Sequence, residues 1–194
     1  MGKVKFISDL HFGHSNVLSF DARPFKTIGE HDSELIRRWN EETDIDDDIW
    51  ILGDISWYGA TKTIDLFSQL NGTKHLIIGN HDKKLLRNPN VRAMFADIYD
   101  YKEITVALDN GQMANVVLSH YPIPCFNRHY YGDYHLYGHV HTGFEYNMMQ
   151  RVKTQMQDLY DKPCNMYNVG CMLPEMDYTP RTLSWIIEAY GGTQ

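Results

Sequence analysis

The feature of this sequence that most restricts its fold is a series of short apolar runs that end on the same few polar residue types. Such runs are too short for helices and suit buried strands. In a sheet whose strands are joined by helical crossovers, ligand-binding side chains gather beyond the carboxyl ends of the strands. We therefore predict that distant parts of the chain meet in one polar site. Its residues follow five of the runs: Asp9 with His11, Asp54, Asn80 with His81, His120, and His139 with His141.

The segments between these runs predict helices and further strands. Thr27 and Glu30 form a capping box at the start of a helical pattern. Apolar residues at helical spacing from Met148 to Leu159 predict a helix that packs on the sheet, with a partner surface or a lid as the alternative. Helices are expected from Thr27 to the acidic stretch 41–48, over 62–70 and over 148–159. Strands are expected over 4–8, 49–52, 75–78, 134–137 and 166–169, and as a hairpin over 101–108 and 113–119, with 182–190 as a closing helix or strand.

Length and composition predict one domain over residues 1–194 and exclude several kinds of protein. The 194 residues are 43% hydrophobic, which is enough for a sizeable core. The net charge of −7 argues against stable, general nucleic-acid binding, but not against a phosphate-bearing substrate held by metal ions. We recognise no membrane span and no signal peptide. We expect a cytoplasmic protein whose three cysteines, Cys125, Cys164 and Cys171, are reduced thiols.

Seven of the strand-end residues have the chemistry of metal ligands. They offer oxygen or nitrogen atoms and no thiolate. One ion takes about four to six ligands, so seven donors and added water suit two ions. The mixture of imidazole and carboxylate suits divalent manganese, iron, zinc or nickel better than calcium or magnesium, and manganese is our first choice. The seven candidates are Asp9, His11, Asp54, Asn80, His120, His139 and His141.

Four further residues are candidates for roles beside the metals. His81 follows a candidate ligand and is surplus to coordination, so we interpret it as a general acid, with Asp82 holding or polarising its ring. His14 could bind the substrate phosphate or support a ligand. Arg23 could clamp a phosphate, with a surface ion pair as an equal alternative. Among the other histidines, His31, His75 and His135 are assigned to surface or sheet positions, and for His129 a place beside the cleft and a place away from it are equal alternatives.

The order of these residues resembles that of a known family. Asp9-x-His11, Gly53-Asp54, Gly79-Asn80-His81-Asp82, His120 and Gly138-His139-x-His141 resemble the five metal-binding blocks of the calcineurin-like metallophosphoesterases. The run from Asp9 to His14 further resembles small, single-domain bacterial and phage members. The resemblance implies an α/β (α+β) fold, a four-layer sandwich of two mixed β-sheets flanked by helices around a two-metal centre. It also implies that Asp9, His11 and His141 bind the first ion, that Asn80, His120 and His139 bind the second, that Asp54 bridges both, and that His81 protonates the leaving group.

One departure from the family narrows the expected substrate. Protein phosphatases of this superfamily continue the second block with an aspartate and an arginine, where this chain has Trp57 and Tyr58. A protein phosphatase is therefore not expected. We predict hydrolysis of phosphodiesters in small molecules or nucleotides, by a hydroxide that bridges the two ions and attacks phosphorus in line. The alternatives are a phosphomonoesterase or nucleotide pyrophosphatase and, from another class, a non-catalytic metal-bound scaffold.

Overall fold

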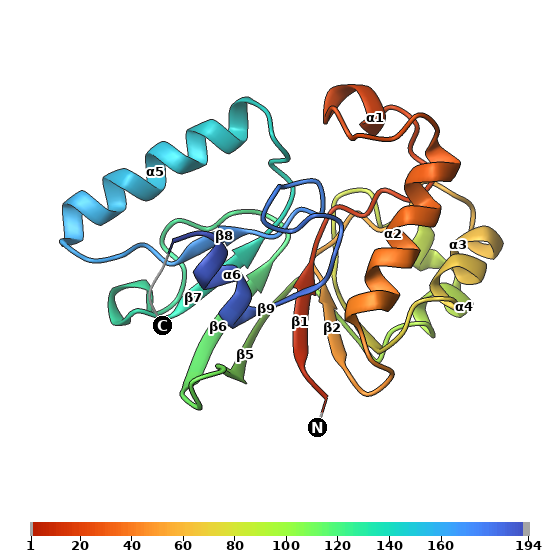
Figure 1. The fold of residues 1–194 in the computed structure, drawn as a ribbon. Helices are drawn as coiled ribbons and strands as arrows, with labels where there is room; N and C mark the ends of the chain where they lie inside the picture. The colour runs from red at the N-terminus through yellow and green to blue at the C-terminus, as the bar shows by residue number, and fades with distance from the viewer. Residues whose placement is uncertain (1, 192–194) are drawn as a thin grey trace.

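The computed structural model describes residues 2–191, and the strands among them form two sheets that face each other (Figure 1). Neighbouring strands of the first sheet are parallel, except for the last, which is antiparallel to its neighbour. The second sheet contains one antiparallel and two parallel pairs. The first has the order β4 (Asp97–Tyr99), β3 (Thr73–Ile77), β2 (Asp48–Ile51), β1 (Val4–Ile7) and β9 (Arg181–Thr182); the second has β5 (Tyr101–Ala107), β6 (Met113–Ser119), β7 (Tyr134–Tyr137) and β8 (Met166–Asn168).

Helices cover the outer face of each sheet. Figure 1 shows α2, α3 and α4 beside the first sheet and α5 beside the second. Short 3-10 turns, η1 (Leu85–Arg87) and η2 (His129–Tyr131), interrupt the connections. The α-helices are α1 (Val17–Phe20), α2 (Ile28–Glu42), α3 (Ala60–Phe67), α4 (Pro89–Arg92), α5 (Phe144–Tyr160) and α6 (Leu183–Ala189).

The parallel strands read as continuous apolar runs because both of their faces are buried. Along β2, Trp50 packs into the core between the sheets, whereas Ile49 and Ile51 pack toward the helices. In β1 the neighbours Phe6 and Ile7 divide in the same way. This alternation follows from the two-residue period of a strand. The structure confirms the predicted sandwich of two mixed sheets flanked by helices.

The start of α2 differs in detail from the predicted capping box. Thr27 is the N-cap, and its Oγ1 accepts a hydrogen bond from the backbone N–H of Glu30 at 3.1 Å. The Glu30 carboxylate accepts from the N–H of Lys26 at 2.9 Å, one residue before the cap, and not from the N–H of Thr27. The cap therefore satisfies one free N–H of the first helical turn, and the reciprocal bond is displaced by one residue.

Several boundaries and short elements differ from the sequence predictions. The segment 182–190 contains both expected alternatives, because Arg181–Thr182 pairs with β1 and Leu183–Ala189 is helical. The strand β4 and the one-turn helices α1 and α4 were not predicted, since three- or four-residue elements show no resolvable period. Among residues 2–191, no helix combines the length and apolar character that a membrane span needs.

Candidate metal centre

The seven predicted metal ligands meet at the carboxyl ends of strands from both sheets. The turns after β1, β2 and β3 bring Asp9, His11, Asp54 and Asn80, and those after β6 and β7 bring the other three. Close approach depends on small residues. Gly53 has a φ of +91°, and a Cβ there would collide with His120 and with the backbone of Gly79. Five of the seven, Asp9, His11, Asp54, His139 and His141, themselves have positive φ values. Residues in this sparsely populated region concentrate at functional sites.

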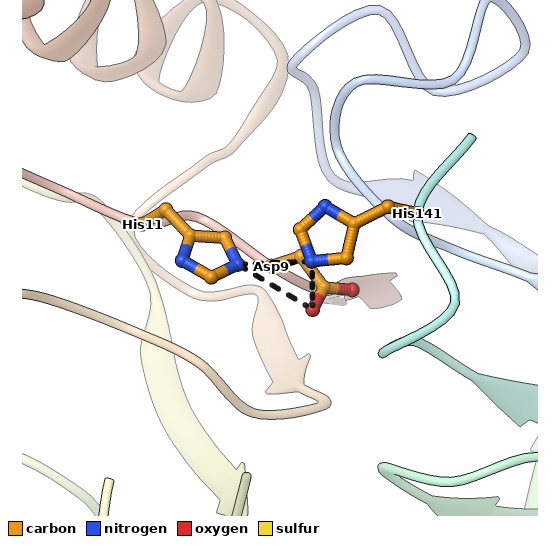
Figure 2. A group of neighbouring side chains, drawn as sticks. All are labelled: Asp9, His11 and His141. Atoms are coloured by element: carbon orange, nitrogen blue, oxygen red, sulfur yellow. Dashed lines mark hydrogen bonds and ion pairs between the residues drawn. The ribbon is translucent and has the colours of Figure 1, made fainter. Parts of the chain in front are cut away.

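One group of donors consists of Asp9, His11 and His141. Figure 2 shows both imidazole rings directed at the Asp9 carboxylate. The Oδ1 atom of Asp9 lies 3.8 Å from His11 Nε2 and 3.7 Å from His141 Nε2. The two Nε2 atoms are 3.2 Å apart. Three donor atoms therefore converge on one point, supplied by the buried Asp9 and His11 and the half-buried His141.

A second group consists of Asn80, His120 and His139. The Oδ1 atom of Asn80 lies 2.8 Å from His120 Nε2 and 3.0 Å from His139 Nδ1. Asp54 lies between the two groups, with Oδ2 at 3.8 Å from His11 Nε2 and Oδ1 at 3.7 Å from His120 Nε2. The two groups are therefore adjacent and share a carboxylate.

The hydrogen bonds of the outer ring nitrogens test whether these residues fit metal ions. His120 Nδ1 lies 2.7 Å from the carbonyl oxygen of Leu52, and His141 Nδ1 lies 2.9 Å from the Asp21 carboxylate. Carbonyl and carboxylate oxygens accept, so each Nδ1 donates and the Nε2 of the neutral ring carries a free lone pair. The His120 lone pair points at another acceptor, Asn80 Oδ1, at 2.8 Å. A cation between them satisfies both partners, and outer partners of this kind are typical of metal-binding histidines.

Burial and neighbouring charges set the protonation of the centre. Burial alone favours the neutral His141 ring, but the hydrogen bond to Asp21 and the Asp9 charge outweigh it and raise the pKa of His141, so a cation at Nε2 would replace a proton there. Burial lowers the pKa of His11 well below its usual value, with Arg23 and His141 lowering it further, so the ring is neutral and able to bind a metal. Burial and then the nearby Asp9 carboxylate raise the pKa of Asp54 to about 7. Two carboxylates brought this close out of water require positive charge to remain ionised together. The charge balance of the site therefore also fits divalent cations.

The structure places His81 at the rim of the centre. Its backbone N–H donates to Asp54 Oδ1 at 3.0 Å, while its ring is exposed and packs on Trp57 with 4.3 Å between ring centroids. Burial lowers the pKa of His81, and the Asp82 charge opposes the shift. The exposed ring can exchange a proton with solvent, and the lowered pKa makes its protonated form a stronger acid.

The predicted role of Asp82 needs correction. Its side chain is fully buried, and its two oxygens accept from the backbone N–H groups of Gly79, Asp54 and Ile55 at 2.7 to 2.9 Å. Asp82 thus joins the turns after β2 and β3. Its influence on His81 is through charge and through the shape of the turn, and not through a hydrogen bond to the ring.

The interpretation of Arg23 as a phosphate clamp is also wrong. The residue is 3% exposed. Its guanidinium donates to the Asp21 carboxylate and to the carbonyl oxygens of Asp9 and Leu10. These bonds hold the turn that carries Asp9 and fix the carboxylate that orients His141. Arg23 therefore stabilises the segments that carry Asp9 and Asp21, and its buried side chain cannot contact a substrate.

His14 and Trp57 form an aromatic border on the same side as His81. Their rings stack with 3.9 Å between centroids and 4° between planes, and His14 Nδ1 lies 3.4 Å from His11 Nδ1. Trp57 also packs on the His11 ring at 4.7 Å. His14 therefore stands where either predicted role, binding of phosphate or support of a ligand, is sterically open.

Sequence reasoning missed two contributors, Asp21 and Trp57. Asp21 was not singled out because its contact with His141 spans 120 positions, and only an acidic residue two positions before Arg23 hinted at it. Of the three histidines assigned to surface or sheet positions, two lie in strands and one does not. His75 and His135 lie in β3 and β7, whereas His31 is a fully buried residue of α2 whose ring contacts Asp32 and Arg23.

Comparisons with known proteins agree with this geometry. Residues 2–143 match the family model described as calcineurin-like phosphoesterase. The Gene 66 protein of Mycobacterium phage D29 is 38% identical over 133 residues, which are 63% of this chain and 65% of that protein. An uncharacterized protein of Methanocaldococcus jannaschii is 40% identical over 85 residues, 43% of this chain and 48% of that protein. The chain thus spans about half to two thirds of the length of these relatives.

A solved structure shows the same fold over almost the whole chain. It is the crystal structure of a protein of unknown function from Aquifex aeolicus, with a TM-score of 0.65 and 25% sequence identity. The alignment covers 93% of this chain and 95% of that one. The sandwich fold is therefore shared by this protein of Aquifex aeolicus.

Proposed function

This chain belongs to the calcineurin-like phosphoesterase family, and from that premise we propose that it is a phosphodiesterase with two divalent transition-metal ions. The observation that carries the proposal is the convergence of histidine and carboxylate donors on Asp9 and Asp54, with the Asn80 amide oxygen beside His120. Asp9, His11 and His141 would hold one ion, and Asn80, His120 and His139 the other. Asp54, which lies between the two groups, would contribute to both. Manganese suits this donor set best, with iron, zinc and nickel as alternatives.

Bound cations of this kind supply positive charge for the phosphoryl oxygens and activate water for attack on phosphorus. The chain itself contributes position and proton transfer. Asp21 and the Leu52 carbonyl oxygen hold the imidazoles of His141 and His120 in the tautomer that can bind a metal. His81, at the exposed rim, donates a proton to the departing oxygen. No covalent enzyme intermediate is required.

One feature supports diesters over monoesters, since a general acid assists the alkoxide leaving groups of both classes. Trp57 and Tyr58 stand where the protein phosphatases of the superfamily place an aspartate and a phosphate-binding arginine. Trp57 packs against His11 and His14, and the Tyr58 hydroxyl donates to Asp32 at 2.9 Å, so neither offers a cation to a dianionic monoester.

The metal requirement is tested with purified protein that has been stripped by a chelator and reloaded with manganese. We expect hydrolysis of bis(p-nitrophenyl) phosphate to disappear on stripping and to return on reloading, with up to two ions bound per chain. Full activity after complete removal of metal contradicts the proposal. Metal binding without hydrolysis of any diester or monoester indicates a scaffold instead.

The role of His81 is tested by the dependence on the leaving group. His81→Ala should retain both ions and slow hydrolysis of a dinucleoside monophosphate, which needs a protonated leaving oxygen, by roughly 10² to 10⁴. It should slow bis(p-nitrophenyl) phosphate far less, because nitrophenolate leaves without a proton. His129→Ala, at a half-buried histidine outside the centre, is the control. Equal losses on both substrates, or loss of metal, exclude the acid role.

A further inference from the structure

A cavity opens beside His81, on the side to which the proposed acid would deliver its proton. Its volume is about 690 Å³. One wall is the turn after β2, residues 56–60. The other is formed by seven residues after β3: Asn80, His81, Lys83, Lys84, Leu85, Arg87 and Asn88. Asn80 and His81 form its inner end, so the cavity is continuous with the candidate metal centre.

Three cations line this cavity and have no counter-charge in it. Lys83, Lys84 and Arg87 are exposed, and none forms an ion pair with a carboxylate in residues 2–191. The lining residues include no aspartate or glutamate. This is unusual in a chain with 25 acidic against 18 basic residues, where a random patch is more often acidic. Free cations around a concave wall favour an anionic group.

The position of the cavity identifies which part of a substrate it would meet. In-line displacement places the leaving group opposite the attacking water, and His81 lies on the leaving side if it is the acid. Trp57, 37% exposed, and Tyr58 add apolar surface beside the cations. The cavity is also large enough for a nucleoside-sized group, given that small-molecule sites span roughly 300 to 1,000 Å³.

We propose that this cavity is the binding site for the leaving group, and that Lys83, Lys84 and Arg87 select a leaving group that itself carries a phosphate. The inference rests on the proposed function, because it takes the reacting phosphorus to lie at the metal centre and His81 to be the acid. Its substrates are phosphodiesters in which the alcohol that departs is a phosphorylated nucleoside or a similar phosphorylated compound.

The test compares three diesters that share the same scissile bond. They are dithymidine monophosphate and its two derivatives with one additional phosphate at either end. Product analysis shows which nucleoside departs. We expect kcat/KM to be at least about ten-fold higher when the additional phosphate is on the departing nucleoside, a difference equal to about 1.4 kcal/mol. Raising the salt concentration should reduce the ratio, because exposed charges are screened.

A triple variant, Lys83→Gln with Lys84→Gln and Arg87→Gln, should bring that ratio close to one. The matched control removes the same charge elsewhere, with Lys3→Gln, Lys26→Gln and Arg151→Gln, which are exposed residues outside the cavity. It should keep the ratio of the parent protein. Circular dichroism melting of each variant confirms folding, and the single variant Lys84→Gln serves if the triple variant does not fold.

The possible failures are distinguishable. Manganese-dependent hydrolysis of bis(p-nitrophenyl) phosphate without any preference among the dinucleotides, or without their hydrolysis, overturns the inference and leaves the proposed function standing. A preference that survives in the triple variant, or that disappears equally in the control variant, also overturns it. Inactivity of metal-loaded protein toward every ester removes the proposed function and the inference together.

Discussion

His135 lies within β7 with its ring fully buried and both nitrogens occupied. Nδ1 is 3.0 Å from the carbonyl oxygen of Val117, and Nε2 accepts from the N–H of Ile123 at 2.9 Å. The neutral ring satisfies both partners, whereas a protonated ring would set two N–H groups against each other. Burial accordingly lowers the pKa of His135 to about 4.

This lowered pKa predicts that the free energy of unfolding depends on pH. Unfolded His135 takes up a proton near pH 6.5 and the folded residue only near pH 4, so the unfolded state binds more protons between these values. The contribution is complete above pH 6.5 and decreases as the pH falls, by at most about 3 kcal/mol at pH 4.

The measurement is denaturant unfolding of the metal-free protein and of His135→Gln across this range. Glutamine offers a donor and an acceptor but does not titrate. As the pH falls to 4, the variant should therefore lose less unfolding free energy than the parent protein, by up to about 3 kcal/mol. Parallel curves for the two proteins would falsify the assignment.

For single residues, the sequence predicted which side chains converge as metal ligands, but not which residues hold those ligands in place. Asp9, Asp54 and His120 could be predicted to meet because each follows an apolar run, and strand ends of one sandwich lie at a common edge. The roles of Arg23 and Asp82 could not be predicted, because residue type alone does not show whether a charged side chain is buried or exposed. Asp82 accepts from backbone N–H groups, which leave no mark on residue type. Arg23 donates to two backbone carbonyl oxygens and to the Asp21 side chain, and its Nη1 also contacts His31 and Cys171.

Among the elements, α2 depends on its N-cap. Its first turn is exposed at Thr27, while Leu35 and Trp39 further along are fully buried against the first sheet. Thr27→Ala removes the oxygen that accepts from the Glu30 N–H and should reduce the free energy of unfolding by about 1 kcal/mol.

Thr154→Ala is the matched control for this change. Thr154 is an exposed residue in the interior of α5 whose hydroxyl donates to the carbonyl oxygen of Gln150. Alanine is the better helix former at such a position, so this variant should be as stable as the parent protein or slightly more stable. Equal destabilisation of both variants in a urea melt contradicts the capping argument.

The elements that could be predicted are those whose period or turn chemistry is complete within the segment. The hairpin of β5 and β6 has its Asp-Asn-Gly turn, and α2 and α5 have several turns of apolar spacing. The strand β4 has three residues and is defined by pairing with β3 at the edge of the first sheet. This strand forms because Asp97 pairs with His75, 22 positions earlier in the chain. A pattern within three residues cannot predict such a long-range pairing.

Across the whole molecule, the candidate metal centre joins the two sheets. The turns after the first sheet provide Asp9, His11, Asp54 and Asn80, and the turns after the second provide His120, His139 and His141. A ligand that binds only the assembled site stabilises the folded chain by mass action. We therefore expect manganese at 100 times its dissociation constant to add about 2.7 kcal/mol to the free energy of unfolding.

This increase is measured by thermal or denaturant unfolding with manganese and with a chelator. Asp54→Asn weakens the residue shared by both donor groups and should lose most of the manganese-dependent increase. An unchanged unfolding transition after chelation, in protein shown beforehand to contain metal, excludes a site that spans the two sheets.

The positive φ values at Asp9, His11, Asp54, His139 and His141 have a consequence for engineering. A left-handed conformation costs an ordinary L-residue roughly 1 to 2 kcal/mol, less for aspartate and histidine, and glycine adopts it freely. At these five positions glycine would give the more stable fold, whereas aspartate or histidine is needed to bind metal. A library selected for heat resistance alone, in a chelating medium, should therefore drift toward glycine, first at the half-buried His139. Selection that is to yield a robust hydrolase has to impose metal binding in the same round.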